Sequence, residues 1–135
     1  MTNRTLMLIS GLFGLSGVAL GAVGAHALGA QLTASGQLEN WKTAVSYQSI
    51  HAIAILTVAL WLDQVGPTGK FRLLKTAATA WTIGIVLFSG SLYAFALGCP
   101  KWIWPATPLG GLAFLIGWGC IAACGLDKKS PPASP

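Results

Sequence analysis

Polar and ionisable side chains set inside long uncharged stretches are the residues of this chain that could do chemistry. If those stretches are helices that cross a bilayer, at about 1.5 Å per residue, all of these side chains fall in the outer half of the membrane. They are His26, Tyr47, Gln48, His51, Ser89, Tyr93 and Thr107. Because polar groups in lipid are costly, they usually turn inward. The sequence therefore predicts one of two things: a structural hydrogen-bond network, or a small pocket that opens to the extracytoplasmic side.

Catalytic and cofactor chemistry lack the residues they need. No Asp or Glu lies inside the uncharged stretches, so there is no acid and base pair, no carboxylate to orient either histidine, and no usual group for proton translocation. Axial haem ligands should lie at similar depths, whereas His26 and His51 differ by about 9 Å. Cys99, Cys120 and Cys124 are too few and too scattered for a metal cage. We predict no catalytic residue, no cofactor and no metal, and hence no enzyme.

The elements that must position these side chains follow from composition. Of the 135 residues 54% are hydrophobic and 8% are charged, whereas a soluble protein carries about 25% charged residues. Four stretches lack Lys, Arg, Asp and Glu, and each reaches the ~20 residues that a membrane-crossing helix requires. The predicted spans are residues 5–28, 43–62, 76–97 and 107–125.

The connections between these spans are short, so consecutive spans must be antiparallel. The expected fold is an all-α integral membrane protein, an antiparallel up-down bundle of four transmembrane helices. Residues 1–127 form one domain in this interpretation. The tail at 128–135 is rich in Ser, Pro and Lys and is expected to be flexible.

The net charge of +5 is explained by topology. Six basic residues lie on the side of the N-terminus and two, Lys42 and Lys101, lie on the other side. The positive-inside rule then places both termini in the cytoplasm, in a multi-pass protein of a bacterial inner membrane. No basic patch with interleaved aromatic residues remains for nucleic acid. A cleaved signal peptide is the alternative for the first span, but its apolar run is longer than the usual 7 to 15 residues, so we expect the span to be retained.

Small residues recur on the first span at steps of four and three, which places them on one face of a helix. This small-residue stripe consists of Ser10, Gly14, Gly17, Gly21 and Gly24. In lipid, helices associate by close backbone approach along such faces. Further packing positions are expected at Gly84, Gly90, Gly110 and Gly117.

Four segments together resemble a known family. They are GAVGAHAL at 21–28, TAVSYQ with HA at 43–52, GIVLFSGSLY at 84–93 and TPLGGLAFLIGW at 107–118. In this order they are similar to the domain of unknown function 423 family, which includes YgdD-type inner-membrane proteins and transmembrane protein 256. The resemblance implies a four-span inner-membrane protein, and it supplies no catalytic residues.

Two functions remain open from the sequence. The first is a structural or accessory subunit that associates with itself or with other membrane protein subunits, because several spans offer small-residue faces. The second is a protein that binds a lipid, a quinone or another small molecule, or a minor carrier, using the outer-half polar residues. Membrane lipids are partners in both cases.

Overall fold

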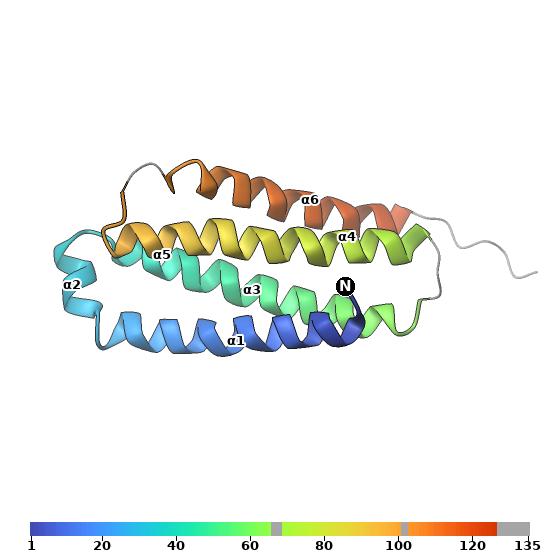
Figure 1. Ribbon diagram of the computed structural model, residues 1–135, viewed down its shortest axis with the longest axis horizontal. Coiled ribbons are helices and arrows are strands. Elements are labelled where there is room, and N and C mark those ends of the chain that lie inside the picture. The colour runs from blue at the N-terminus through green and yellow to red at the C-terminus, as the bar shows by residue number, and fades with distance from the viewer. Residues whose placement is uncertain (66–68, 101–102, 127–135) are drawn as a thin grey trace, which may run out of the picture.

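The computed structural model describes residues 1–65, 69–100 and 103–126, and within these ranges it contains helices and no strand (Figure 1). Four helical spans are long and apolar enough to cross a membrane. They are α1 (Asn3–Ala25), α3 (Leu38–Leu62), a composite third span and α6 (Ala106–Leu126). The third span joins α4 (Gly69–Gly84), the π-helix η1 (Ile85–Ser89) and α5 (Gly90–Ala96). The predicted all-α fold with four antiparallel spans is confirmed.

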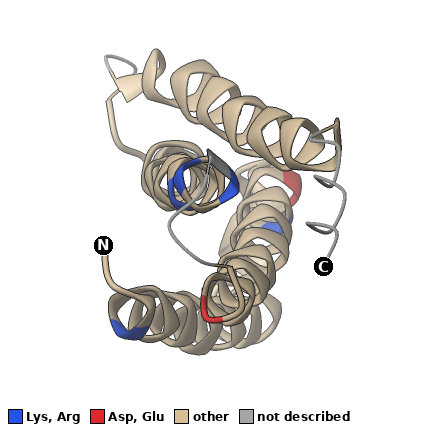
Figure 2. Cartoon of the chain, turned by 90° about the vertical axis from the view of Figure 1, so that its right-hand side faces the viewer, with Lys and Arg blue, Asp and Glu red and all other residues tan. Residues whose placement is uncertain are grey.

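Two of the four spans lie in the middle of the bundle and two lie at its edges. In Figures 1 and 2, α1 lies at one edge and α6 at the opposite edge, with α3 and the third span between them. The outer helices are accordingly little covered: 17% of the apolar stretch of α1 and 22% of that of α6 are buried, against 39% for α3 and 44% for the third span. Most of α1 and α6 therefore faces lipid.

The small-residue stripe of α1 lies along α3. A Cβ atom on Gly24 would overlap the Trp41 indole, whose N–H donates to the Leu20 carbonyl at 2.9 Å. Nearer the middle, Ser10 Oγ donates to the Ala52 carbonyl at 2.9 Å. The remaining members of the stripe differ in how closely α3 approaches them. A Cβ on Gly17 would be 3.2 Å from Ser49 Oγ, one on Gly21 would be 3.5 Å from Val45, and one on Gly14 would meet nothing within 4 Å.

Glycines and large aromatic rings are paired between the third span and α6. Beside Gly84 lies the Phe114 ring, and against Gly117 lies the Trp81 indole, in both cases where a Cβ atom would be. Gly110 is tighter still, because a Cβ there would overlap the backbone of Phe88. Gly90, in contrast, faces open space. Close packing along these glycines thus occurs within the chain.

The π-helix η1 changes the face that the third span presents. Such a segment holds more residues per turn than an α-helix, so it rotates the side chains that follow it. Before η1, α4 packs mainly on α6, and after η1, α5 packs mainly on α3. Ile85 and Ser89 of η1 are buried. The last part of the third span, α5, is thereby directed toward α3 and away from α6.

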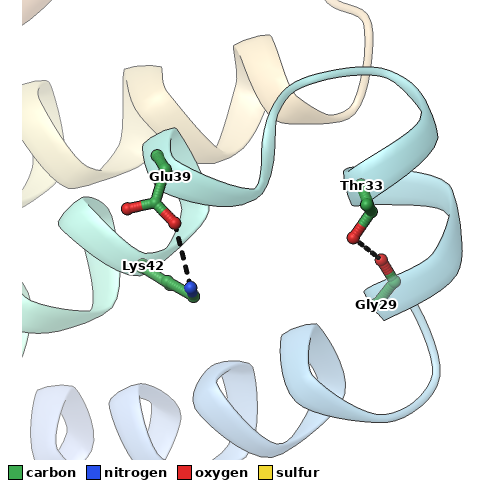
Figure 3. A network of polar contacts seen from close by, with 4 residues as sticks. All are labelled: Gly29, Thr33, Glu39 and Lys42. Atoms are coloured by element: carbon green, nitrogen blue, oxygen red, sulfur yellow. Dashed lines mark hydrogen bonds and ion pairs between the residues drawn. The ribbon is translucent and has the colours of Figure 1, made fainter.

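The glycines, Thr33 and Ser35 of residues 29–36 predict a turn between the first two spans, but the structure has a short helix there, α2 (Gly29–Ala34). Leu32 is its anchor, buried in a cluster with Trp41 and Ala96. The Thr33 hydroxyl donates to the Gly29 carbonyl at 2.8 Å (Figure 3). The glycines, Thr and Ser of this segment predicted a turn because their local preferences were weighed without the packing of Leu32. The true turn is confined to the residues after Ala34, where Gly36 has φ +69°.

Local preferences in the sequence predict Ser35 or Gly36 as the cap of the second span and Thr107 as the cap of the fourth, and both predictions are wrong. The helix α3 has Gln37 at its N-cap, with no side-chain hydrogen bond, rather than Ser35 or Gly36. In α6 the first helical residue is Ala106, so Thr107 lies inside the helix, where its hydroxyl is 2.6 Å from Ser91 Oγ. A tertiary partner has replaced the capping bond. The predicted tail at 128–135 lies outside the described residues.

Candidate functional site: a groove between α3 and α6

The polar residues expected to form one pocket are divided among several places. Gln48 and Tyr93 meet between α1, α3 and α5, and His51 and Tyr47 lie toward α6. His26 joins neither group: it is exposed at the C-cap of α1, and its ring makes no hydrogen bond within the described part of the chain. The division arises because Gln48 follows Tyr47 by one residue, which on a helix turns its side chain by about 100°.

Gln48 is the centre of a buried hydrogen-bond network. Its Nε2 donates to the Phe13 carbonyl and to Ser16 Oγ, both at 2.8 Å. Its Oε1 accepts the Tyr93 hydroxyl at 3.0 Å. Three spans are joined through this one amide, whose donors and acceptor are all used. The network is therefore structural and leaves no group of Gln48 for a ligand.

Ser89 and Thr107 play separate parts. The Ser91 hydroxyl, which bonds Thr107, lies 2.9 Å from the Phe88 carbonyl, so this pair links α5 to the start of α6. Ser89 is fully buried, and its Oγ has no hydrogen-bond partner among the described residues. Among the described residues, neither the Ser89 hydroxyl nor the Thr107 hydroxyl forms a hydrogen bond with a member of the Gln48 network.

His51 is held in one tautomer by its neighbours. Its Nδ1 lies 2.8 Å from the Tyr47 carbonyl, which can only accept, so the proton is on Nδ1. Its Nε2 accepts the Trp118 indole N–H at 3.1 Å. The ring is stacked on Phe114 with centroids 3.7 Å apart and planes 12° apart. With both nitrogens used, the buried imidazole has no lone pair left for a haem iron or a metal.

A cavity of about 580 Å³ lies beside this histidine, and we name it the lateral groove. It lies between α3 and α6 on a floor formed by η1. Its lining residues are Tyr47, His51, Phe88, Pro108, Gly111, Leu112, Phe114, Leu115 and Trp118. Leu112, Leu115 and Trp118 are each about half or more exposed, so the groove opens sideways toward lipid. Its volume lies within the 300–1,000 Å³ typical of small-molecule sites.

Tyr47 is the polar side chain at the open surface of the groove. It is 41% exposed, and its ring packs against Phe88 and Phe114 with centroid distances of 4.7 and 5.7 Å. The described residues offer its hydroxyl no hydrogen-bond partner. Tyr47 is the fifth residue of the span predicted at 43–62, so its Cα lies about 6 Å inside the outer end of that span.

A second cavity of about 380 Å³ continues below Trp118, which lines both. This second cavity is lined mostly by apolar side chains of α3 and α6, together with Thr57 of α3 and Trp81 of α4. The indole N–H of Trp81 is buried and unpaired among the described residues. The same residues hold no group of three or more His, Cys, Asp or Glu side chains that could bind a metal ion.

Sequence reasoning missed the aromatic half of this site. Trp118 bonds His51, and Phe88 and Phe114 form the groove wall, yet large aromatic residues in a membrane span are typical of packing and gave no signal of their own. An indole N–H in the middle of an apolar span was the available clue, because such a donor needs a partner and His51 is an acceptor at mid-span.

Comparisons with known proteins place this arrangement in a family. A family model described as a protein of unknown function (DUF423) matches residues 20–111, which include α3, α4, η1 and α5 with Tyr47, His51 and Phe88. No solved structure matches the chain.

Curated relatives match nearly the whole chain. A UPF0382 membrane protein of Haemophilus influenzae is 43% identical over 131 residues, 96% of this chain and 99% of its own. The UPF0382 inner membrane protein YgdD of Escherichia coli K12 is 36% identical over 134 residues, 96% of each chain. The Bacillus subtilis protein YwdK is 36% identical over 115 residues, 85% of this chain and 90% of its own. The resemblance noted from the sequence is therefore confirmed, and the protein is a four-span membrane protein that belongs to the DUF423 family.

Proposed function

We propose that the protein binds an amphiphilic molecule, a lipid or a hydrophobic small molecule with a polar group, in the lateral groove. The observation that carries this proposal is the unpaired Tyr47 hydroxyl at a groove of about 580 Å³. A hydroxyl without a partner in an apolar medium costs several kcal/mol on water-to-cyclohexane scales. An occupant that supplies both apolar area and one hydrogen-bonding group would remove this cost.

The shape of the groove supports an occupant that enters from the bilayer. Its open side carries Leu112 and Leu115, which are 54% and 70% exposed. Its floor is made of rings that interlock with one another, since Phe88 and Phe114 meet edge to face at 5.6 Å. A chain or a flat ring lying on this floor would bury apolar surface without displacing any internal hydrogen bond.

Filling the groove tests the proposal directly. Gly111 lines it, and a Cβ added there would meet only the Phe88 ring, at 4.0 Å, so Gly111→Leu should fold and occupy the space. Lipid retained by the protein in a mild detergent should fall about tenfold or more, because a steric cost of only ~1.4 kcal/mol is a tenfold change in affinity. Native mass spectrometry measures the retained lipid.

The matched control is Gly119→Leu, on the same helix. Gly119 is exposed, and nothing lies within 4 Å of the Cβ it would gain. Retention of lipid by this variant should equal that of the wild type. Equal lipid retention by the Gly111 variant and the wild type would refute the proposal.

A second role, as an accessory subunit, is supported by the outer helices. The apolar stretches of α1 and α6 are 17% and 22% buried, which leaves two lipid-facing surfaces for other membrane proteins or a second copy. The glycines that first motivated this role mostly contact neighbours within the chain. The same mass spectra distinguish the roles, since a bound protein and a bound lipid differ greatly in mass. Strictly monomeric protein would contradict the accessory role.

We also propose that both termini face the cytoplasm. Arg4 and the basic start of α4, with Lys70, Arg72 and Lys75, lie at the end that carries the N-terminus, which faces the viewer in Figure 2. Cys99 is exposed after α5, at the other end, whereas Cys120 and Cys124 are half-buried and buried. A membrane-impermeant maleimide should therefore label spheroplasts at Cys99, and Cys99→Ser should abolish the labelling. Labelling only after lysis would reverse the orientation.

A further inference from the structure

We infer that the lateral groove and the second cavity, which we name the inner cavity, form one site for a single apolar chain longer than one leaflet of the bilayer. This inference rests on the proposed function, because it assigns the apolar part of the molecule that binds beside Tyr47. The two cavities, of about 580 and 380 Å³, lie one after the other between α3 and α6 and share Trp118 in their linings. This end-to-end arrangement suits one long chain rather than two chains side by side.

The linings of both cavities follow one face of α3. Residues at alternating steps of four and three share a face of a helix, and these are Tyr47 and His51 in the groove and Ala54, Val58 and Trp61 in the inner cavity. From Tyr47 to Trp61 this face is about 21 Å long. One leaflet contributes only about 15 Å of hydrocarbon. A chain that begins at Tyr47 and follows the whole face therefore extends past the middle of the bilayer.

The packing of the spans leaves this face open to lipid. The helix α3 packs mainly on α1, and α6 packs mainly on α4, so a seam remains between α3 and α6. Ile53 and Trp61, which line the inner cavity, are 66% and 39% exposed. An occupant can therefore enter sideways from the bilayer along the length of the seam, and it does not have to thread through a closed bundle.

Trp118 forms part of the floor where the two cavities meet. Its indole N–H donates to His51 Nε2 at 3.1 Å, and its ring lies 4.8 Å from that of Trp81 between centroids. Both His51 and Trp81 are buried, so these contacts hold Trp118 on the inner side of the seam. The 46% of Trp118 that is exposed is then left on the open side. A chain passing from the groove to the inner cavity would pack on this ring without displacing the hydrogen bond to His51.

The polar groups of the two cavities give the site a direction. In the inner cavity the Thr57 hydroxyl donates to the Ile53 carbonyl at 3.0 Å, and the Trp81 indole N–H lies against Gly117 of α6. In the groove the Tyr47 hydroxyl has no partner among the described residues. The inner cavity thus suits the apolar end of the molecule, whose polar group lies at Tyr47.

The test compares farnesol and solanesol, two polyprenyl alcohols that carry the same hydroxyl head on a short and a long chain. Each is titrated into delipidated full-length protein in a mild detergent and followed by native mass spectrometry. Thr57 is exposed, lines the inner cavity and lies about 15 Å below Tyr47 along α3, a level that only the longer chain reaches. Thr57→Phe should therefore weaken solanesol binding about tenfold, or ~1.4 kcal/mol, and leave farnesol binding unchanged.

The matched control is Leu60→Phe, which adds the same ring to α3 at a position that is 51% exposed and outside both linings. It should change the binding of neither alcohol. Comparing one alcohol between two variants also cancels the preference of that alcohol for the detergent.

The outcomes separate this inference from the proposed function. Unchanged solanesol binding by Thr57→Phe, with both alcohols still weakened by Gly111→Leu, would overturn the long-chain site and leave groove binding intact. Equal weakening of both alcohols by Thr57→Phe would overturn it likewise. If Gly111→Leu weakens neither alcohol, or if neither binds the wild type, the groove proposal fails and the long-chain site with it.

A measurement on the wild type does not depend on any substitution. A long polyprenol with a diazirine at the far end of its chain should crosslink, on illumination, to the lining of the inner cavity, at Ile53, Thr57 or Ile121. Crosslinks confined to the lining of the groove, such as Leu112 and Leu115, would overturn the inference.

Discussion

Gly110→Ala is expected to lower the free energy of unfolding by about 1–3 kcal/mol, the usual cost of overpacking a close-packed core. The added Cβ would overlap the backbone N of Phe88 and lie 2.8 and 2.9 Å from its Cβ and Cα. A flexible side chain could move aside, whereas the backbone of η1 is held by the helix on both sides. The helices α6 and η1 would have to separate. Unfolding in mixed micelles with increasing SDS, followed by circular dichroism, measures the effect.

Gly119→Ala is the control for this substitution. It changes the same residue type on the same helix at a position with nothing within 4 Å of the new Cβ. Helix propensity favours alanine over glycine by up to about 1 kcal/mol at both positions, so the control should be neutral or stabilising. Equal stability of the two variants would show that η1 and α6 are less closely packed than described.

Gln48→Met should destabilise the protein by roughly 2–5 kcal/mol. The substitution retains most of the side-chain volume but removes three hydrogen bonds, those to the Phe13 carbonyl, Ser16 and Tyr93. Hydrogen bonds between membrane helices average about 0.6 kcal/mol and reach about 1.7 kcal/mol each. The loss should be near the upper end, because the Tyr93 hydroxyl then remains in the interior without its acceptor.

Tyr93→Phe provides the internal comparison for Gln48. It removes one of the three bonds and should cost about 0.6–1.7 kcal/mol. In a double-mutant cycle the Tyr93 substitution should add little once Gln48 is methionine, because the pair no longer interacts. Full additivity of the two substitutions would mean that the amide and the phenol do not share a bond.

Much of the fold could be predicted because charge is so unevenly distributed along the chain. The absence of charged residues over four long runs is a global signal, and a bilayer accepts few other interpretations of it. Local elements were harder. In α2, Leu32 packs in a cluster with Trp41, and in η1, Phe88 lies against Gly110. In both cases the partner lies outside the segment, so the residues of the segment alone do not indicate the contact.

The candidate site could be predicted only in part, because helical spacing shows which side chains share a face of a helix but not which helix that face contacts. Tyr47 and His51, four residues apart, do lie together at the lateral groove. Gln48, one residue after Tyr47, faces α1 and α5 instead of α6. His26 is exposed because α1 ends before it. Which span lies opposite each face depends on the order of helices across the bundle. That order places α6, with Trp118, beside His51 and places α1, with Phe13 and Ser16, beside Gln48.

The π-helix η1 divides the third span into two parts that pack on different neighbours. Before it, α4 packs mainly on α6, and after it, α5 packs mainly on α3. Substitutions in α5 should therefore alter the packing against α3 at one end of the bundle and leave the packing of α4 on α6 at the other end largely unchanged.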